Sequence, residues 1–153
     1  MTKRLNFFAT SPQGMAILLE QENYLRAQFD ELFPLNMALW ELVKLRVSQI
    51  NQCAYCVDMH NKDAIHLGES AERLYGLSVW EEMPFYTEVE KCALGWSELL
   101  TLGQTVSDQT YQDAVETLGE QGLTHLTLAV NAINSWNRLS KAFKPEVGSY
   151  TVS

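Results

Sequence analysis

The sequence has no apolar run long enough to cross a membrane and no segment typical of secretion. Across its 153 residues, no apolar stretch approaches the roughly 18 residues that a membrane helix needs. The apolar run behind Lys3 and Arg4, from Leu5 to Ala9, is broken by Asn6 and is too short for a signal-peptide core. We therefore expect a protein with neither a membrane span nor a secretion signal.

Positive charge is scarce. The chain has 11 Lys and Arg residues against 19 Asp and Glu residues, which gives a net charge of −8. No basic cluster longer than Lys3-Arg4 interrupts this trend, and an acidic chain repels the phosphates of nucleic acids. The composition thus argues against nucleic-acid binding.

Cysteine is also scarce. The chain has three cysteines, an odd number, and no secretion signal, which does not suit a structural disulfide scaffold. We therefore expect the protein to reside in a reducing cytoplasm. In that compartment a C-x-x-C pair indicates redox chemistry or metal binding.

Strand patterns are missing as well, because no segment alternates apolar and polar residues between hairpin turns. Apolar residues recur instead at helical spacing, and the length suits a single core. We predict one all-α domain over residues 1–153, a helical bundle of seven to eight helices. The expected helices cover about 12–29, 34–50, 53–68, 70–77, 87–103, 107–118 and 124–142.

Capping residues support several of these boundaries. Ser11-Pro12 is a helix start, since serine caps free N–H groups and proline fits the first helical position. Capping-box spacing occurs at Ser78 to Glu81 and at Thr87 to Glu90. Gly119 is expected to end the helix that starts at Ser107.

Reactive residue types gather between Glu41 and His60. Cys53 and Cys56 fall in the first turn of an expected helix, where free N–H groups and the helix dipole favour a thiolate. Three residues apart, they share a face and can close a small disulfide. The alternative is half a zinc site, completed by His60 with His66 or Cys92.

His60 lies one helical turn after Cys56, so its imidazole can accept a thiol proton directly or through a water. In one unbroken helix Glu41 would be about 18 Å from Cys53. If the chain turns near Asn51-Gln52, Glu41 lies opposite His60 or Ala64. The plainer alternatives are a surface Glu41–Lys44 pair and a core histidine.

The pattern of Glu41, eleven residues, Cys53-Ala-Tyr-Cys56, three residues and His60 resembles the core motif of the alkylhydroperoxidase D and carboxymuconolactone decarboxylase family. Lys91 to Trp96 and Ile133 to Arg138 resemble two further blocks of that family. The resemblance covers about residues 15–143 and is closest to the redox-type members.

The resemblance implies an all-helical subunit that assembles into trimers or hexamers, with thiol-dependent peroxidase activity on organic hydroperoxides. Cys56 would attack the peroxide and become a sulfenic acid, Cys53 would resolve it as a disulfide, and Glu41 and His60 would form the proton relay. No bound cofactor or metal is implied, because an external dithiol, lipoyl or thioredoxin-like, regenerates the thiols. Some relatives carry a histidine where this chain has Tyr55, which cannot act as a base near neutral pH.

Two other functions stay open. The family is also associated with lactone decarboxylation, which the acidic balance and the intact C-x-x-C disfavour. A non-enzymatic zinc-stabilised or redox-sensing oligomer is the third hypothesis. Among the remaining residues we expect Cys92 to be a small core residue, and Asn134, Trp136 and Asn137 to support the site. We expect the aromatic segment 80–86 to line a substrate pocket, to join the core or to form a subunit contact.

Overall fold

The computed structural model describes residues 3–153, and within that range the regular structure is helical. The all-α prediction is therefore confirmed. No helix within this range combines the length and apolar character that crossing a membrane requires. The elements are α1 (Phe7–Thr10), α2 (Pro12–Glu31), α3 (Met37–Ile50), α4 (Ala54–His66), α5 (Ala71–Gly76), the 3-10 helix η1 (Leu77–Glu82), α6 (Glu88–Thr101) and α7 (Asp108–Phe143).

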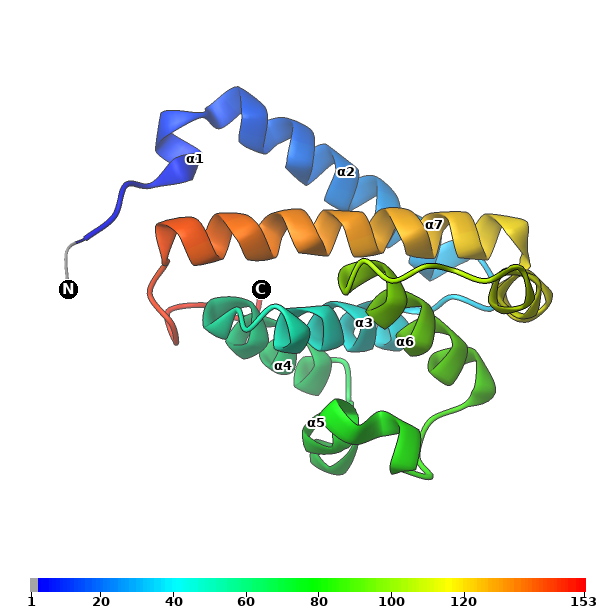
Figure 1. The fold of residues 1–153 in the computed structure, drawn as a ribbon. Coiled ribbons are helices and arrows are strands. Elements are labelled where there is room, and N and C mark those ends of the chain that lie inside the picture. Colours follow the sequence, from blue (N-terminus) through cyan, green and yellow to red (C-terminus); the bar gives the residue numbers. More distant parts are fainter. Residues whose placement is uncertain (1–2) are drawn as a thin grey trace.

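The long helix α7 organises the molecule. It packs against α2 on one side and against α3, α4 and α6 on the other (Figure 1). The N-terminal part of α2, with α1 at its end, diverges from α7, whereas the rest of α2 approaches it (Figure 1). Residues of α2 and of the C-terminal half of α7 line a common cavity, which adjoins the site.

Two groups of buried side chains form the core. The larger group joins α2, α3, α6 and α7 around Phe29, Trp40 and Leu126, and the ring of Phe29 meets that of Trp40 edge-on at 5.0 Å. The smaller group lies between α3, α4, α5 and η1 and includes Leu42, Leu77 and Trp80. Helix α3 contributes to both groups, so its orientation is fixed from two sides.

Three predicted boundaries need correction. Helix α3 begins at Met37 with Asn36 as its cap, rather than at Pro34. The Ser78 capping box is wrong, because that segment belongs to η1. The expected break at Gly119 is present as a residue with φ of 72° inside α7, and the chain resumes its helix directly after it rather than at Thr124.

The capping box at the start of α6 is confirmed and gives a simple stability test. The Thr87 side chain accepts a hydrogen bond from the Glu90 N–H, and the Glu90 carboxylate accepts one from the Thr87 N–H. Replacing Thr87 with alanine should lower the free energy of unfolding by about 1 kcal/mol. Urea denaturation measures this. The control is Thr117→Ala, which removes a hydroxyl group from a position within α7 that is not at a helix start. An equal loss of unfolding free energy in both variants would contradict the capping role.

Candidate active site

The site is built on the hairpin of α3 and α4. Helix α3 ends at Ile50, and Gln52 takes a left-handed conformation with φ of 55°, so the chain turns sharply before Cys53. The Cys53 N–H then donates to the Ser48 carbonyl at 3.0 Å, which closes the turn. The two helices pack against each other, as the turn predicted at Asn51-Gln52 requires.

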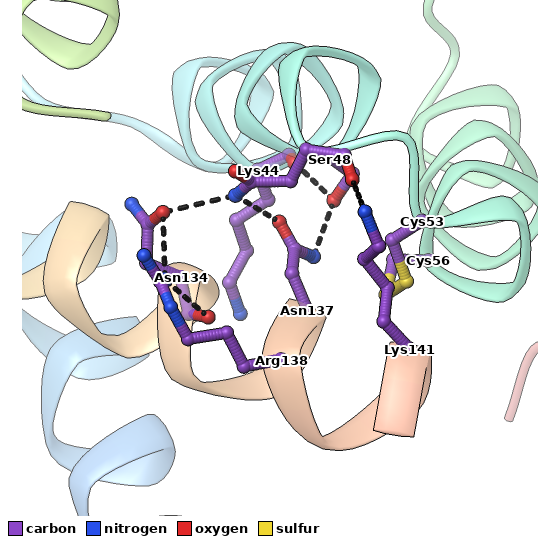
Figure 2. The surroundings of a disulfide bond; sticks show 9 residues. Lys44, Ser48, Cys53, Cys56, Asn134, Asn137, Arg138 and Lys141 are labelled. Atoms are coloured by element: carbon purple, nitrogen blue, oxygen red, sulfur yellow. Dashed lines mark hydrogen bonds between the residues drawn. A yellow bond between two sulfur atoms is a disulfide. The ribbon is translucent and has the colours of Figure 1, made fainter. Parts of the chain in front are cut away.

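Polar side chains of α7 hold this turn in place beside the cysteine pair (Figure 2). The Asn51 amide donates to the side-chain oxygens of Asn134 and Asn137, both at 2.9 Å. Asn137 in turn donates to the Ser48 hydroxyl at 3.0 Å, and the Lys141 ammonium donates to the Asn51 carbonyl at 2.7 Å. Asn134 and Asn137 were expected to support the site, and their side chains bond to the turn that precedes the cysteine pair.

Cys53 and Cys56 are bonded as a disulfide across the first turn of α4, with their Cα atoms 5.3 Å apart. Cys53 is the N-cap of α4 and Cys56 lies three residues later, so both sulfur atoms are close to the free N–H groups of a 13-residue helix. In the reduced protein these N–H groups favour thiolates. Both side chains are buried, but Cys56 alone lines the adjoining cavity.

Glu41 and His60 meet across the hairpin. The His60 Nδ1 atom lies 2.8 Å from a Glu41 carboxylate oxygen, and both side chains are buried. An ionised carboxylate only accepts hydrogen bonds, so Nδ1 carries the proton and Nε2 is left as an acceptor. The surface Glu41–Lys44 pair is wrong, because Lys44 pairs with Glu22 instead.

A cavity of about 1180 Å³ opens beside these residues. This is larger than most ligand pockets, which are roughly 300–1,000 Å³. Its walls come from the N-terminal segment, α2, α3, α4, the end of α7 and the C-terminal tail, and many are apolar or aromatic. Its lining includes Cys56, His60, Tyr55, Trp40 and Trp136. A thiol and an imidazole one turn apart on α4 therefore face the same space.

An ion pair of Lys44 and Glu22 lies in the cavity wall. The Lys44 ammonium is also 3.8 Å from the centre of the Trp40 ring, and the side chain is buried. Burial lowers the pKa of Lys44, while the neighbouring Glu22 carboxylate acts in the opposite direction. This pair was not predictable from the sequence, since Glu22 and Lys44 are 22 residues apart and come from different helices.

The C-terminal tail reaches the site through Tyr150. Its hydroxyl donates to the Asp63 carboxylate at 2.7 Å, and the Lys62 ammonium donates to the Tyr150 carbonyl at 3.0 Å. Burial raises the pKa of Tyr150 to about 12, and the Asp63 carboxylate adds to the effect. These bonds anchor the tail against α4.

Asp63 gives a pH test. Burial raises its pKa above the ordinary value near ~3.9, although the hydrogen bond from Tyr150 partly offsets this. A carboxyl group whose pKa is higher in the folded than in the unfolded protein stabilises the fold at pH values below its pKa in the unfolded state. That stabilisation is lost as the pH rises through its pKa in the folded state. Asp63→Asn should therefore raise the melting temperature at pH 7 and have no such effect near pH 3.

Thermal melts of the wild type and of Asp63→Asn at both pH values measure this. Asp30→Asn, at an exposed position, is the matched control. An Asp63→Asn variant that is less stable than the wild type at pH 7 would contradict the sign.

Within residues 3–153, one group of side chains has the spacing to hold a metal ion: Glu41, His60 and Asp63, with ligand atoms within 4.8 Å of one another. Neither thiol belongs to it. The zinc arrangement considered from the sequence is not formed, because Cys53 and Cys56 are bonded to each other, His66 is exposed and Cys92 lies in α6.

The remaining candidates lie elsewhere. Cys92 is half-buried against the larger core group, and burial raises the pKa of its thiol. It borders a second hollow of about 710 Å³, together with Trp80. Trp80 and Tyr86 belong to the smaller core group, and neither lines the cavity beside Cys56. Trp80 and Tyr86 are therefore core residues, whereas Phe85 of the same segment is exposed.

Comparisons with known proteins agree with this geometry. The sequence profile of the carboxymuconolactone decarboxylase family matches residues 22–99, a range that contains Glu41, both thiols and His60. The uncharacterized protein YdfG of Bacillus subtilis (strain 168) is 40% identical over 144 residues, which cover 93% of this chain and 95% of the relative.

Solved structures share the fold. A protein of unknown function from Agrobacterium tumefaciens, whose name proposes an antioxidant defence protein of the AhpD type, superposes with a TM-score of 0.85 at 33% identity. That match covers 99% of this chain and 100% of the other. An uncharacterized peroxidase-related protein from Silicibacter sp. TM1040 gives a TM-score of 0.80 at 15% identity, over 93% of this chain and 74% of the other. The second likeness concerns the fold alone.

Proposed function

The chain belongs to the carboxymuconolactone decarboxylase family, and on this premise we propose that it is a thiol-dependent hydroperoxide reductase with Cys56 as its nucleophile. The observation that carries the proposal is the placement of Cys56 and His60 on one cavity wall, with Glu41 hydrogen-bonded behind His60. Cys53 is joined to Cys56 and lies away from the cavity lining, which suits a resolving thiol.

The chemistry is a two-electron reduction. The Cys56 thiolate attacks the terminal oxygen of the hydroperoxide, the O–O bond breaks, and an alcohol leaves with the proton that His60 took from the thiol. Cys56 becomes a sulfenic acid. The Cys53 thiol then displaces water from that sulfur and forms the disulfide. An external dithiol, lipoyl or thioredoxin-like, reduces the disulfide by exchange and is itself oxidised.

Hydroperoxide consumption tests the proposal. The reduced protein, freed of reductant, is mixed with excess cumene hydroperoxide, and both the remaining peroxide and the free thiols are titrated. We expect one peroxide to be consumed, and two thiols to be lost, per chain. Adding dihydrolipoamide should make the consumption catalytic. Peroxide that stays at its starting concentration would contradict the proposed function.

Lactone decarboxylation remains the second candidate because the family carries that name. The chain as a whole is acidic, but five basic residues line the cavity. The net charge of the chain is therefore a weaker argument against an anionic lactone substrate than it was for the sequence alone. The disulfide-forming pair still has no use in that reaction. Release of carbon dioxide from a carboxymuconolactone would favour this candidate.

For a zinc-stabilised oligomer, metal analysis should find about one zinc per chain.

We also propose that the chain forms a homo-oligomer, a trimer or hexamer. Helix α2 exposes Ile17 and Tyr24, which are large apolar or aromatic side chains outside the cavity lining. Such exposed groups mark association surfaces. Light scattering in solution should give three or six times the chain mass of 17.4 kDa; a monomer would contradict this proposal.

A further inference from the structure

The charge of the cavity differs in sign from that of the chain. Five of the 11 basic residues line it, but only four of the 19 acidic ones. The cavity therefore carries one net positive charge, and the rest of the molecule carries nine net negative charges. The five basic residues are Lys3, Arg4, Arg26, Lys44 and Lys144, and the four acidic residues are Glu22, Glu41, Asp63 and Glu146.

The positive charge lies on the exposed residues of the lining. Lys44, the one buried cation of the lining, is neutralised by Glu22 and covered by the Trp40 ring. The other four cations are exposed, whereas Glu146 is the one exposed carboxylate of the lining. The buried and half-buried part of the lining thus holds a net negative set of paired groups. Its exposed charged residues, here called the rim, carry a cationic excess.

Some of the rim cations are available to a ligand. Arg4 donates a hydrogen bond to the Ala142 carbonyl. Within residues 3–153, neither Arg26 nor Lys144 takes part in an ion pair or a side-chain hydrogen bond. Arg26 is one helical turn beyond Glu22 on α2, so the rim and the buried ion pair lie on one face of that helix.

Much of the remaining lining is apolar. The aromatic rings of Phe7, Phe8, Trp136 and Phe143 line the cavity, and Phe8 stacks on Trp136 with ring centres 6.2 Å apart. Such a surface favours an apolar body and gains little from a small polar peroxide. The cavity lining therefore combines the reactive residues Cys56 and His60, an apolar aromatic surface and the cationic rim.

We propose that the substrate is an amphipathic hydroperoxide with a terminal carboxylate, whose apolar body packs on the aromatic walls and whose carboxylate lies among the exposed cations that include Arg26 and Lys144. This inference rests on the proposed function, because it places the peroxide group at Cys56. The carboxylate stays at the rim, since the buried acids of the interior would repel it. The inference adds a substrate class to the site.

A binding experiment tests the carboxylate without any turnover. Oleate and methyl oleate, both below their micelle concentrations, are titrated into the protein at low salt and followed by tryptophan fluorescence, since Trp40 and Trp136 line the cavity. We expect oleate to bind at least about threefold more tightly than the ester, which is the scale of exposed ion pairs. The preference should disappear in 1 M salt, where the screening length is about 3 Å.

Charge variants assign the preference to the rim. In the double variant Arg26→Gln with Lys144→Gln the ratio of the two affinities should fall to about one, while Lys91→Gln, the same change on the α6 surface, should keep the wild-type ratio. Circular dichroism checks that each variant is folded. A ratio that is unchanged in the double variant, insensitive to salt or in favour of the ester would overturn the inference.

Turnover separates this inference from the proposed function. The reduced wild type is given linoleic acid hydroperoxide and its methyl ester, and kcat/KM is measured for each. Reduction of the acid at least about threefold faster than the ester supports both proposals. Reduction of both at equal rates overturns the carboxylate and leaves the peroxidase standing. Reduction of neither, with the oleate preference intact, overturns the peroxidase but not the binding of an anionic amphipath.

Discussion

Replacing Cys56 with serine should reduce hydroperoxide turnover by at least ~10³-fold, because the attacking thiolate is removed and a serine hydroxyl is a poor nucleophile at neutral pH. The measurement is kcat/KM with cumene hydroperoxide in the presence of dihydrolipoamide. Cys56 is buried but lines the cavity, so the substitution acts at the point where the peroxide meets the chain.

Two other cysteine variants make this result specific. Cys92→Ser is the matched control, since Cys92 lies in α6 beside the second hollow and should keep wild-type turnover. Cys53→Ser should still consume one peroxide per chain in a first turnover, because Cys56 is present, but should then stop at the sulfenic acid. Wild-type turnover in Cys56→Ser, or single-turnover activity in Cys56→Ser with none in Cys53→Ser, would contradict the assigned roles.

The second large effect is expected at His60. Its replacement by asparagine removes the group that takes the proton from Cys56, and a positioned acid–base group of this kind contributes about 10²–10⁴-fold. The loss should appear in kcat/KM for peroxide and also in the rate at which iodoacetamide alkylates Cys56 in the reduced protein. The second readout reports the thiolate directly and does not depend on substrate binding.

Glu41 and His66 complete the comparison. Glu41→Gln keeps the size of the side chain but removes the charge that His60 Nδ1 faces at 2.8 Å, so we expect a smaller loss than at His60. His66→Gln changes an exposed histidine in the last turn of the same helix and should leave the rate unaltered. An alkylation rate of Cys56 that is the same in His60→Asn and in the wild type would contradict the relay.

The geometry of the Glu41–His60 pair was predictable because it depends on local features. The helical spacing of Cys56 and His60 fixes their common face, and the weak helix pattern at Asn51-Gln52 marks the turn that brings α3 back along α4. Given that turn, simple length counting places Glu41 opposite His60. Capping at Thr87 was predictable for the same reason.

The cavity was not predictable, since it depends on contacts between distant segments. Glu22 pairs with Lys44 from another helix, and Tyr150 reaches Asp63 across 87 residues. No periodicity in the sequence encodes such pairs. The start of α3 was missed for a different reason. Proline is a common first residue of a helix, but this helix begins only after Asn36, whose side chain accepts a hydrogen bond from the Leu39 N–H at 2.8 Å.

Net charge was the least informative of the sequence features. A value of −8 describes the whole chain, yet four of the five exposed charged residues of the cavity lining are cations. Those residues come from the N-terminal segment, α2 and the C-terminal tail, which are far apart in the chain. The net charge of a sequence does not show where its cations lie in the fold. It therefore argues against nucleic-acid binding better than it argues against binding of a small anionic ligand.

The central claim is that Cys56 takes the oxygen and Cys53 resolves it, and trapping the sulfenic acid tests this directly. The reduced wild type and Cys53→Ser are exposed briefly to cumene hydroperoxide, quenched with dimedone, digested and examined by mass spectrometry. The account predicts a reversible Cys53–Cys56 disulfide in the wild type and a dimedone adduct on Cys56 in the variant. An adduct on Cys92, with Cys56 still reduced, would contradict it.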